Sequence, residues 1–149
     1  MSSIKGTQTE KNLLASFAGE SQARNRYTYA AKVAEKEGFP QISALFLETA
    51  DNERVHAKSM FNFLEGGMVE ITASYPAGVV GTTLENLTAA AEGELEEHSY
   101  LYPQFAETAQ KEGFPQIASL YRSIAKAEAW HERRYRQLIA HISGNTLYK

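Results

Sequence analysis

Apolar and small residues recur every three or four positions along most of this chain, the spacing that places them on one face of an α-helix. The pattern predicts four helices over about residues 9–37, 40–65, 82–112 and 115–143. The apolar faces also carry acids: Glu20, Glu53, Glu94 and Glu128 each fall on a different helix. Carboxylates mixed into an inward apolar face predict a helical bundle with a polar site in its core.

Two short breaks and one long break separate the four helices. Gly38-Phe39-Pro40 ends the first helix and Gly113-Phe114-Pro115 ends the third, because glycine closes a helix in the left-handed conformation and proline fits the first turn of the next. Residues 66–81 contain strong breakers and show no helical period. The expected fold is all-α, one domain over residues 1–149, in which two antiparallel helical hairpins joined by one long crossover form a four-helix bundle.

The second half of the chain repeats the first at an offset of 75 residues. The repeated features are a Gly-Phe-Pro-Gln-Ile element at 38–42 and 113–117, a tyrosine at Tyr27 and Tyr102, and a Glu-x-x-His motif at Glu53/His56 and Glu128/His131. Residues i and i+3 share one face of a helix, so each motif directs a carboxylate and an imidazole toward a common point. The duplication therefore indicates one metal site built from two similar halves.

The repeat is out of step by one residue in the third helix. Glu20 and Glu94 occupy matching inward positions, yet the segment from Glu94 to Tyr102 is one residue longer than the segment from Glu20 to Tyr27. A helix accommodates one extra residue as a π-bulge, often at a functional site. We predict a π-bulge between Glu94 and Tyr102 that turns Glu97 inward beside Glu94, adding a carboxylate that the first half lacks.

The inward polar positions form a set typical of a metal centre: Glu20, Glu53, His56, Glu94, Glu97, Glu128 and His131. Buried carboxylates do not remain ionised and unpaired, because desolvation costs roughly several kcal/mol per ion, and Arg24 alone cannot neutralise them. Two divalent cations would supply the missing positive charge. An oxygen-rich set with one imidazole from each half favours two iron or manganese ions over thiolate-bound zinc or calcium bound by oxygen alone.

The remaining polar and aromatic residues have plainer interpretations. His98 and His141 fall outside the repeated motifs and are expected to be structural, and Arg24, Asn52 and Trp130 are assigned no part in the chemistry. Tyr27 and Tyr102 have two open interpretations: they are core aromatics, or their hydroxyls hydrogen-bond to the ligand carboxylates.

Composition excludes several classes of function. The chain has no cysteine, which excludes disulfides, thiol peroxidase chemistry and thiolate-bound iron or zinc within it. The net charge is −3 and the basic run at 133–136 is short, so we expect no binding to nucleic acid or to anionic membranes. The polar N-terminus has no signal-peptide core and no stretch is apolar over about 18 residues, which predicts a soluble cytoplasmic protein.

Four stretches of the sequence together resemble the rubrerythrin family: residues 18–27 around Glu20, residues 50–56 around the first Glu-x-x-His, residues 91–106 with Glu94 and Glu97, and residues 128–131 with the second motif. The resemblance covers nearly the whole chain. It is specific, because ferritins and manganese catalases share the plan of two glutamates with two Glu-x-x-His motifs but lack the glutamate at the position of Glu97.

The resemblance implies a ferritin-like fold that holds a non-haem di-iron site, with manganese as the other metal that the ligands suit. The implied roles are bridging of both irons by Glu53 and Glu128, binding of one iron by Glu20 and Glu97, and binding of the other by Glu94 and His131. It further implies that His56 replaces Glu97 on its iron when the site is reduced, which makes Glu97 and His56 the catalytic pair. The implied reaction is the reduction of hydrogen peroxide to water.

Rubrerythrins usually continue into a rubredoxin module whose iron is bound by four cysteines, and this sequence contains none. Two explanations stay open: the protein takes electrons from a separate donor such as a free rubredoxin, or the sequence is an excised domain. Two other functions also stay open, a ferroxidase or iron-handling protein and a bundle whose polar seam mediates self-association. In each case we expect a homodimer, with exchange of hairpins between protomers through the crossover as a hypothesis.

Overall fold

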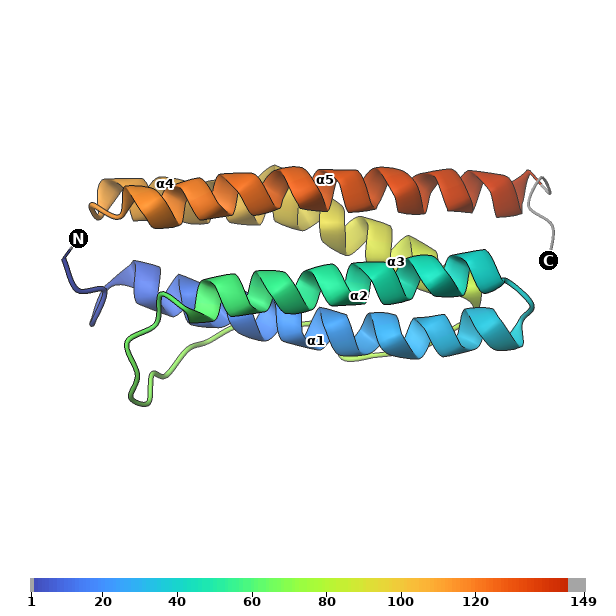
Figure 1. Cartoon of the computed structure of the whole chain (residues 1–149), viewed down its shortest axis with the longest axis horizontal. Helices are drawn as coiled ribbons and strands as arrows, with labels where there is room; N and C mark the ends of the chain where they lie inside the picture. Colours follow the sequence, from blue (N-terminus) through green and yellow to red (C-terminus); the bar gives the residue numbers. More distant parts are fainter. Residues whose placement is uncertain (1, 145–149) are drawn as a thin grey trace.

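The computed structural model describes residues 2–144, which form helices, turns and coil without a β-strand. The helical segments are α1 (Gln8–Lys36), α2 (Pro40–Phe61), α3 (Thr83–Glu96), the π-helical η1 (Glu97–Leu101), α4 (Tyr102–Lys111) and α5 (Pro115–Ser143). Because α3, η1 and α4 follow one another without a break, the chain forms four long rods (Figure 1). The predicted all-α four-helix bundle is confirmed.

The two hairpin turns have the same local structure. Gly38 and Gly113 adopt positive φ angles of 86° and 91°. The following residue closes the helix in both turns, with 2.8 Å hydrogen bonds from Phe39 N to Ala34 O and from Phe114 N to Ala109 O. Proline then occupies the first turn of α2 and of α5. As a result α1 packs along α2, and α3 with α4 packs along α5.

The second helix is shorter than its sequence pattern indicates, since α2 ends at Phe61 and not near residue 65. The chain tightens there: Phe63 N bonds to Met60 O at 3.2 Å and Leu64 N bonds to Phe61 O at 3.0 Å. These contacts span three residues, where an α-helix spans four, so the apolar run Phe63-Leu64 continues the packing without continuing the helix.

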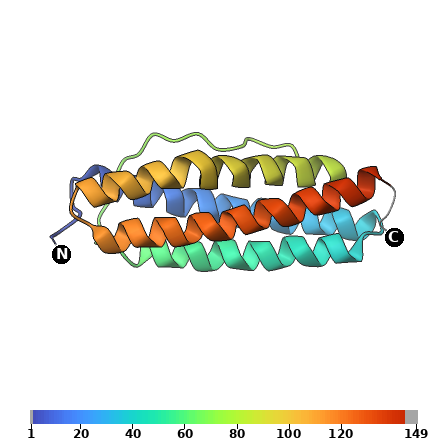
Figure 2. The same cartoon turned by 90° about the horizontal axis from the view of Figure 1, so that it is seen from above.

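Residues 62–82 carry the chain back along the length of the bundle, outside the helices (Figure 2). Tyr75 attaches this crossover to α1: its hydroxyl donates to Ala15 O at 2.5 Å, and a Cβ on Gly19 would lie only 3.3 Å from its ring. The crossover lets α3 begin at the same end of the bundle as the turn between α1 and α2. No helix within residues 2–144 is long and apolar enough to cross a membrane.

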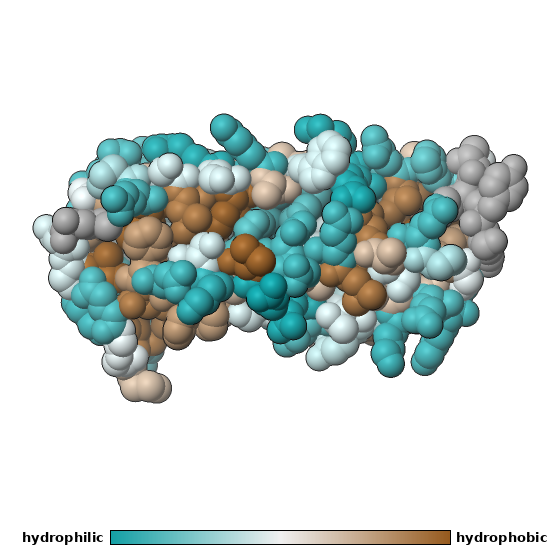
Figure 3. All heavy atoms as spheres, in the orientation of Figure 1, coloured by the Kyte–Doolittle hydropathy of each residue, from teal (hydrophilic) through white to brown (hydrophobic). Residues whose placement is uncertain are grey.

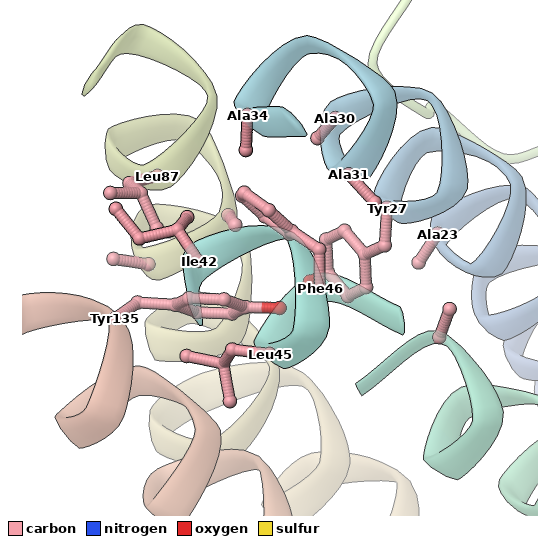
Figure 4. Packing of buried hydrophobic residues seen from close by; sticks show 13 residues of the cluster. Ala23, Tyr27, Ala30, Ala31, Ala34, Ile42, Leu45, Phe46, Leu87 and Tyr135 are labelled. Atoms are coloured by element: carbon pink, nitrogen blue, oxygen red, sulfur yellow. The ribbon is translucent and has the colours of Figure 1, made fainter. Parts of the chain in front are cut away.

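Two apolar clusters lie toward the two ends of the bundle, with the polar residues between them. In the first, Figure 4 shows Tyr27, Phe46 and Tyr135 packed together, with ring centroids 5.4–6.0 Å apart. The second is built around Tyr102, Tyr121 and Met60. Burying each large side chain contributes ~1.5–3 kcal/mol. The two clusters therefore supply the stability that offsets the cost of a polar centre.

Each hairpin also caps the other. The Glu37 side chain accepts a hydrogen bond from Thr83 N at 3.0 Å, at the start of α3. The matching residue of the second half, Glu112, accepts from Thr9 N at 2.8 Å, at the start of α1. A carboxylate is favoured at a helix N-terminus because the first N–H groups have no partner within the helix. These two contacts fix how the hairpins align end to end.

Candidate metal centre

The four rods each place one glutamate in the middle of the bundle. Glu20 comes from α1, Glu53 from α2, Glu94 from α3 and Glu128 from α5, and at most 1% of each residue is exposed. His56 lies one turn after Glu53, and His131 lies one turn after Glu128, so each pair shares a helix face. The helical period that buries the apolar seams thus also buries these acids.

The ligand atoms form two groups that share two members. One group is Glu20, Glu53, His56 and Glu128, and the other is Glu53, Glu94, Glu128 and His131, with the ligand atoms of each group within 4.8 Å of one another. The shortest contacts are His56 Nδ1 to Glu128 Oε1 at 3.3 Å and His131 Nδ1 to Glu53 Oε1 at 3.2 Å. Because Glu53 and Glu128 belong to both groups, the geometry fits two adjacent cations that share two carboxylates.

Most of the buried polar atoms that lack a hydrogen-bond partner in residues 2–144 lie in this cluster. They are Glu20 Oε2, both carboxylate oxygens of Glu53 and of Glu128, Glu94 Oε2, and the Nδ1 atoms of His56 and His131; the remaining one is the Thr83 hydroxyl, away from the cluster. Buried polar groups are normally hydrogen-bonded, and leaving one without a partner costs ~1–3 kcal/mol. Cations would satisfy all eight of the atoms in the cluster at once. The donor set therefore fits two metal ions.

Without cations the acids of the cluster oppose one another's ionisation. Burial raises the pKa of Glu128 well above its ordinary value, and the charges of Glu94 and Glu20 raise it further. Burial also raises the pKa of Glu20, against the opposing effect of His56. Burial acts to raise the pKa of Glu94 as well, but interactions with Glu128, His131 and Tyr27 outweigh it and lower that pKa. The cluster holds either protons or metal ions, not several bare charges.

Glu97 occupies the first position of η1, so the predicted π-bulge is confirmed. The backbone N–H of Tyr102 bonds to Glu97 O, five residues back, and the extra residue of the second half is absorbed there. Glu97 is half-buried and is not a member of either ligand group among the described residues. Burial raises its pKa to about 8, and the charges of Glu20 and Glu94 act in the same direction. Glu97 therefore lies at the edge of the cluster and within its electrostatic field.

The two matching tyrosines bond across the hairpins. Tyr27 of α1 donates from its hydroxyl to Glu94 Oε1 on α3, and Tyr102 of α4 donates to Glu20 Oε1 on α1, both at 2.7 Å. Both rings are also part of the apolar clusters. The two sequence interpretations are thus both correct, because each side chain packs in the core and orients a carboxylate of the opposite hairpin.

Other residues lie as follows. His98 bonds through Nε2 to Glu132 Oε1 at 2.8 Å, outside the cluster, and Trp130 is half exposed with the Arg133 guanidinium 5.2 Å from its ring centre. Asn52 was assigned no part in the chemistry on sequence grounds, yet its side-chain amide lies 3.1 Å from His131 Nε2. Its position directly before Glu53 was the available signal, but the matching residue of the second half is alanine, so no repeat marked it.

A cavity of about 620 Å³ leads to the edge of the cluster. Its walls come from α1, the crossover and the third rod, and they include Gly19, Arg26, Tyr75, Glu97 and Tyr102. The lining combines apolar and polar side chains, and the volume admits a molecule of a few atoms together with water. A small polar substrate would therefore reach the cluster from the side of Glu97.

Comparisons with known proteins agree with this geometry. A family model described as rubrerythrin matches residues 11–139. The chain is 61% identical to rubrerythrin of Porphyromonas gingivalis over 99% of this chain and 74% of that protein. It is 51% identical to rubrerythrin of Nitratidesulfovibrio vulgaris over 99% of this chain and 78% of that protein.

Solved structures give the same result. Nigerythrin in its fully reduced, all-ferrous state matches with a TM-score of 0.80 and 32% identity, over 96% of this chain and 69% of that one. Symerythrin of Cyanophora paradoxa, at 21% identity and a TM-score of 0.78, supports the fold alone. The chain belongs to the rubrerythrin family, whose di-iron ferritin-like fold supports a di-iron oxidoreductase.

Proposed function

We propose that this protein reduces hydrogen peroxide to water at a centre of two iron ions, with electrons from an external donor. The observation that carries the proposal is the pair of ligand groups that share Glu53 and Glu128, because it fits two metal ions held next to each other. A small oxidant that needs two electrons is suited to such a pair. The all-ferrous state in which nigerythrin is known supports iron as the metal.

The bound metals would supply the two electrons for the reaction H₂O₂ + 2H⁺ + 2e⁻ → 2H₂O, one from each Fe(II) ion. The protein's part is to hold the metals and to limit access. Glu53 and Glu128 would hold both ions, Glu20 and Glu97 one of them, and Glu94 and His131 the other. The hydroxyls of Tyr27 and Tyr102 fix two of these carboxylates before any metal binds.

Glu97 and His56 are the residues that we expect to alternate as a metal ligand during the reaction. His56 Nδ1 lies 3.8 Å from Glu20 and 3.3 Å from Glu128, on the side of the cluster that Glu97 borders. Both side chains are partly exposed, unlike the fully buried members. An imidazole and a carboxylate that border one subsite can alternate as its ligand, which gives the site two arrangements for its two oxidation states.

The electrons come from outside the chain in this proposal. The chain has no cysteine, so it holds no thiolate-bound iron that would relay electrons to the buried centre. A small redox protein such as rubredoxin has the required chemistry. The first test of this part is whether reduced rubredoxin, mixed with the oxidised protein and peroxide, is consumed at a rate that depends on both.

We also propose a homodimer. Large apolar side chains lie exposed on the helices, among them Leu47, Val55, Phe61 and Tyr100, each between 47% and 57% exposed. Figure 3 shows apolar areas toward both ends of one face, separated by a hydrophilic band. A second copy would cover such surface. Exchange of hairpins through the crossover would place the two halves of one site on different chains, and dilution to the monomer would then abolish metal binding.

Metal analysis combined with peroxide titration tests the function. We expect two irons per chain, and one equivalent of peroxide should reoxidise the fully reduced protein without release of iron. A protein that instead oxidises added Fe(II) and accumulates a mineral inside a large shell would be a ferroxidase. Tight retention of manganese and no reaction with peroxide when loaded with iron would also overturn the proposal.

A further inference from the structure

The two histidines of the cluster are held differently. His131 is 1% exposed, and its Nε2 atom lies 3.1 Å from the Asn52 side-chain amide. The side chain of His56 is 14% exposed, and within residues 2–144 no side chain forms a hydrogen bond to its Nε2. Among the described residues, His131 therefore has polar side-chain neighbours at both ring nitrogens, whereas the acids that neighbour His56 lie at its Nδ1.

The two halves of the sequence differ at the residue that precedes each Glu-x-x-His motif. Asn52 directly precedes Glu53 on α2 and reaches His131 on α5. Its counterpart in the second half, Ala127, directly precedes Glu128 on α5 and has no polar side-chain atom for His56 on α2. The tyrosines of the two halves still match, because Tyr27 and Tyr102 make reciprocal bonds of equal length, whereas Glu97 of η1 is a second difference and has no counterpart in the first half.

The position of the proton on His131 decides whether it can bind a metal. Its Nδ1 atom lies 3.2–3.4 Å from oxygens of Glu53, Glu94 and Glu128. Only a neutral ring with its proton on Nε2 presents a lone pair from Nδ1 to a cation. That Nε2–H is buried and needs an acceptor, and the oxygen of the Asn52 amide can provide it, since a half turn of the amide exchanges its nitrogen and oxygen.

We propose that Asn52 is a positioning residue that keeps His131 Nδ1 directed at the metal site, while Ala127 leaves His56 unheld. The inference rests on the metal centre proposed above and adds a division of labour between its two histidines. His131 is a permanent ligand because its second nitrogen is fixed. His56 lacks this restraint on its second nitrogen, because the corresponding amide is missing.

Two substitutions of Asn52 distinguish a role as hydrogen-bond acceptor from a role in filling space. Asn52→Leu keeps the size and removes the acceptor, so we expect zinc affinity to fall about 10–100-fold, the usual effect of losing such a partner. Asn52→Asp keeps an acceptor for Nε2–H and should retain zinc affinity. Asp51→Ala, at an exposed neighbour, is the control that should leave it unchanged. The measurement is competition for Zn²⁺ against a chelator, with thermal unfolding to show that each variant is folded.

If Asn52 only filled space in the fold, Asn52→Leu and Asn52→Asp would not differ in zinc affinity in this way. If Asn52→Asp loses as much affinity as Asn52→Leu, or if neither variant loses any, the inference is wrong. If Asn52→Leu does not fold, Asn52→Asp still decides, because nitrogen NMR of its zinc form should show the His131 proton on Nε2. A proton on Nδ1 in that form would refute the proposal.

The reciprocal variant tests the second half of the inference. Ala127→Asn gives α5 the amide that α2 already has, so the exchange of the His56 ring proton with water should slow in the zinc-loaded protein. Unchanged exchange would show that Ala127 is not the reason that His56 is unheld. These zinc measurements need no turnover. A protein that binds zinc as described but ignores peroxide would therefore refute the proposed function alone.

Discussion

The two hairpins share most of the residues that build the polar cluster and differ at two of them. Each supplies an inward glutamate, a Glu-x-x-His motif, a tyrosine that reaches the other hairpin and a glutamate that caps the other hairpin. The second hairpin alone has the π-helical turn with Glu97, and the first alone has Asn52. The shared features build two ligand groups of similar composition, whereas the differences make the surroundings of the two groups unequal.

The largest expected effect comes from the two shared carboxylates. We expect Glu53→Ala and Glu128→Ala each to lose both metals, because each residue belongs to both ligand groups. Metal content after anaerobic loading with Fe(II) measures this, and Glu132→Ala, on the outer part of α5, should keep two metals. If either variant keeps one tightly bound metal, the two halves do not contribute equally to the cage.

Glu97 has no counterpart in the first hairpin, so its removal should affect turnover more than metal content. We expect Glu97→Ala to retain two metals and to lose roughly 100-fold or more in peroxide turnover, the scale of a missing catalytic group. Glu92→Ala, exposed on α3, is the matched control. Unchanged turnover in Glu97→Ala would remove this residue from the mechanism and leave the π-bulge without a chemical role.

The stability of the metal-free protein should depend on pH through Glu97, which has no counterpart in the first hairpin. Burial raises the pKa of Glu97 to about 8 from an ordinary 4.5, so the folded state holds a proton that the unfolded state releases. Stability from this group is present below about pH 4.5 and is lost as the pH rises through 8. We expect the urea midpoint of the metal-free protein to fall between pH 5 and pH 8.5, and to fall less steeply in Glu97→Gln. Equal slopes would show that Glu97 ionises freely.

The hydrogen bonds of Tyr27 and Tyr102 are a feature that both hairpins have. Tyr27→Phe and Tyr102→Phe each remove one 2.7 Å bond to a buried carboxylate. A hydrogen bond contributes ~0.5–1.5 kcal/mol, and ~1.5–3 kcal/mol where the acceptor is charged. We expect the larger loss of unfolding free energy in the metal-free protein for Tyr27→Phe, because the pKa of its acceptor Glu94 is lowered whereas burial raises the pKa of Glu20. Tyr29→Phe, at an exposed position, should change it by no more than ~0.5 kcal/mol. A larger loss for Tyr102→Phe than for Tyr27→Phe would contradict this expectation.

Much of the fold followed from the sequence because its signals are local. The helical period, the Gly-Phe-Pro turns and the one-residue offset before Tyr102 each act within a few residues, and the bundle and η1 are where they predict. The end of α2 was misplaced, because the apolar pair after it packs in a tighter turn. Asn52 was missed for a different reason: its partner lies 79 residues away, and no local pattern specifies contacts between helices.

Removing the helix caps that the hairpins provide for each other should have the smallest effect on the free energy of unfolding. Glu112 accepts from Gln8 N, Thr9 N and the Thr9 hydroxyl, and Glu37 accepts from Thr83 N. We expect Glu112→Ala and Glu37→Ala each to lower the unfolding free energy by ~1 kcal/mol, the usual effect of losing a helix cap. The loss should be the smaller for Glu37, because α3 has the reciprocal pair of capping bonds between Thr82 and Glu85, whereas α1 has the single bond from Glu10 N to the Thr7 side chain. Urea unfolding of the metal-free variants beside Glu35→Ala, an exposed control, would measure this. A larger loss for Glu37 would mean that the bonds between Thr82 and Glu85 do not compensate for the bond lost at Thr83 N.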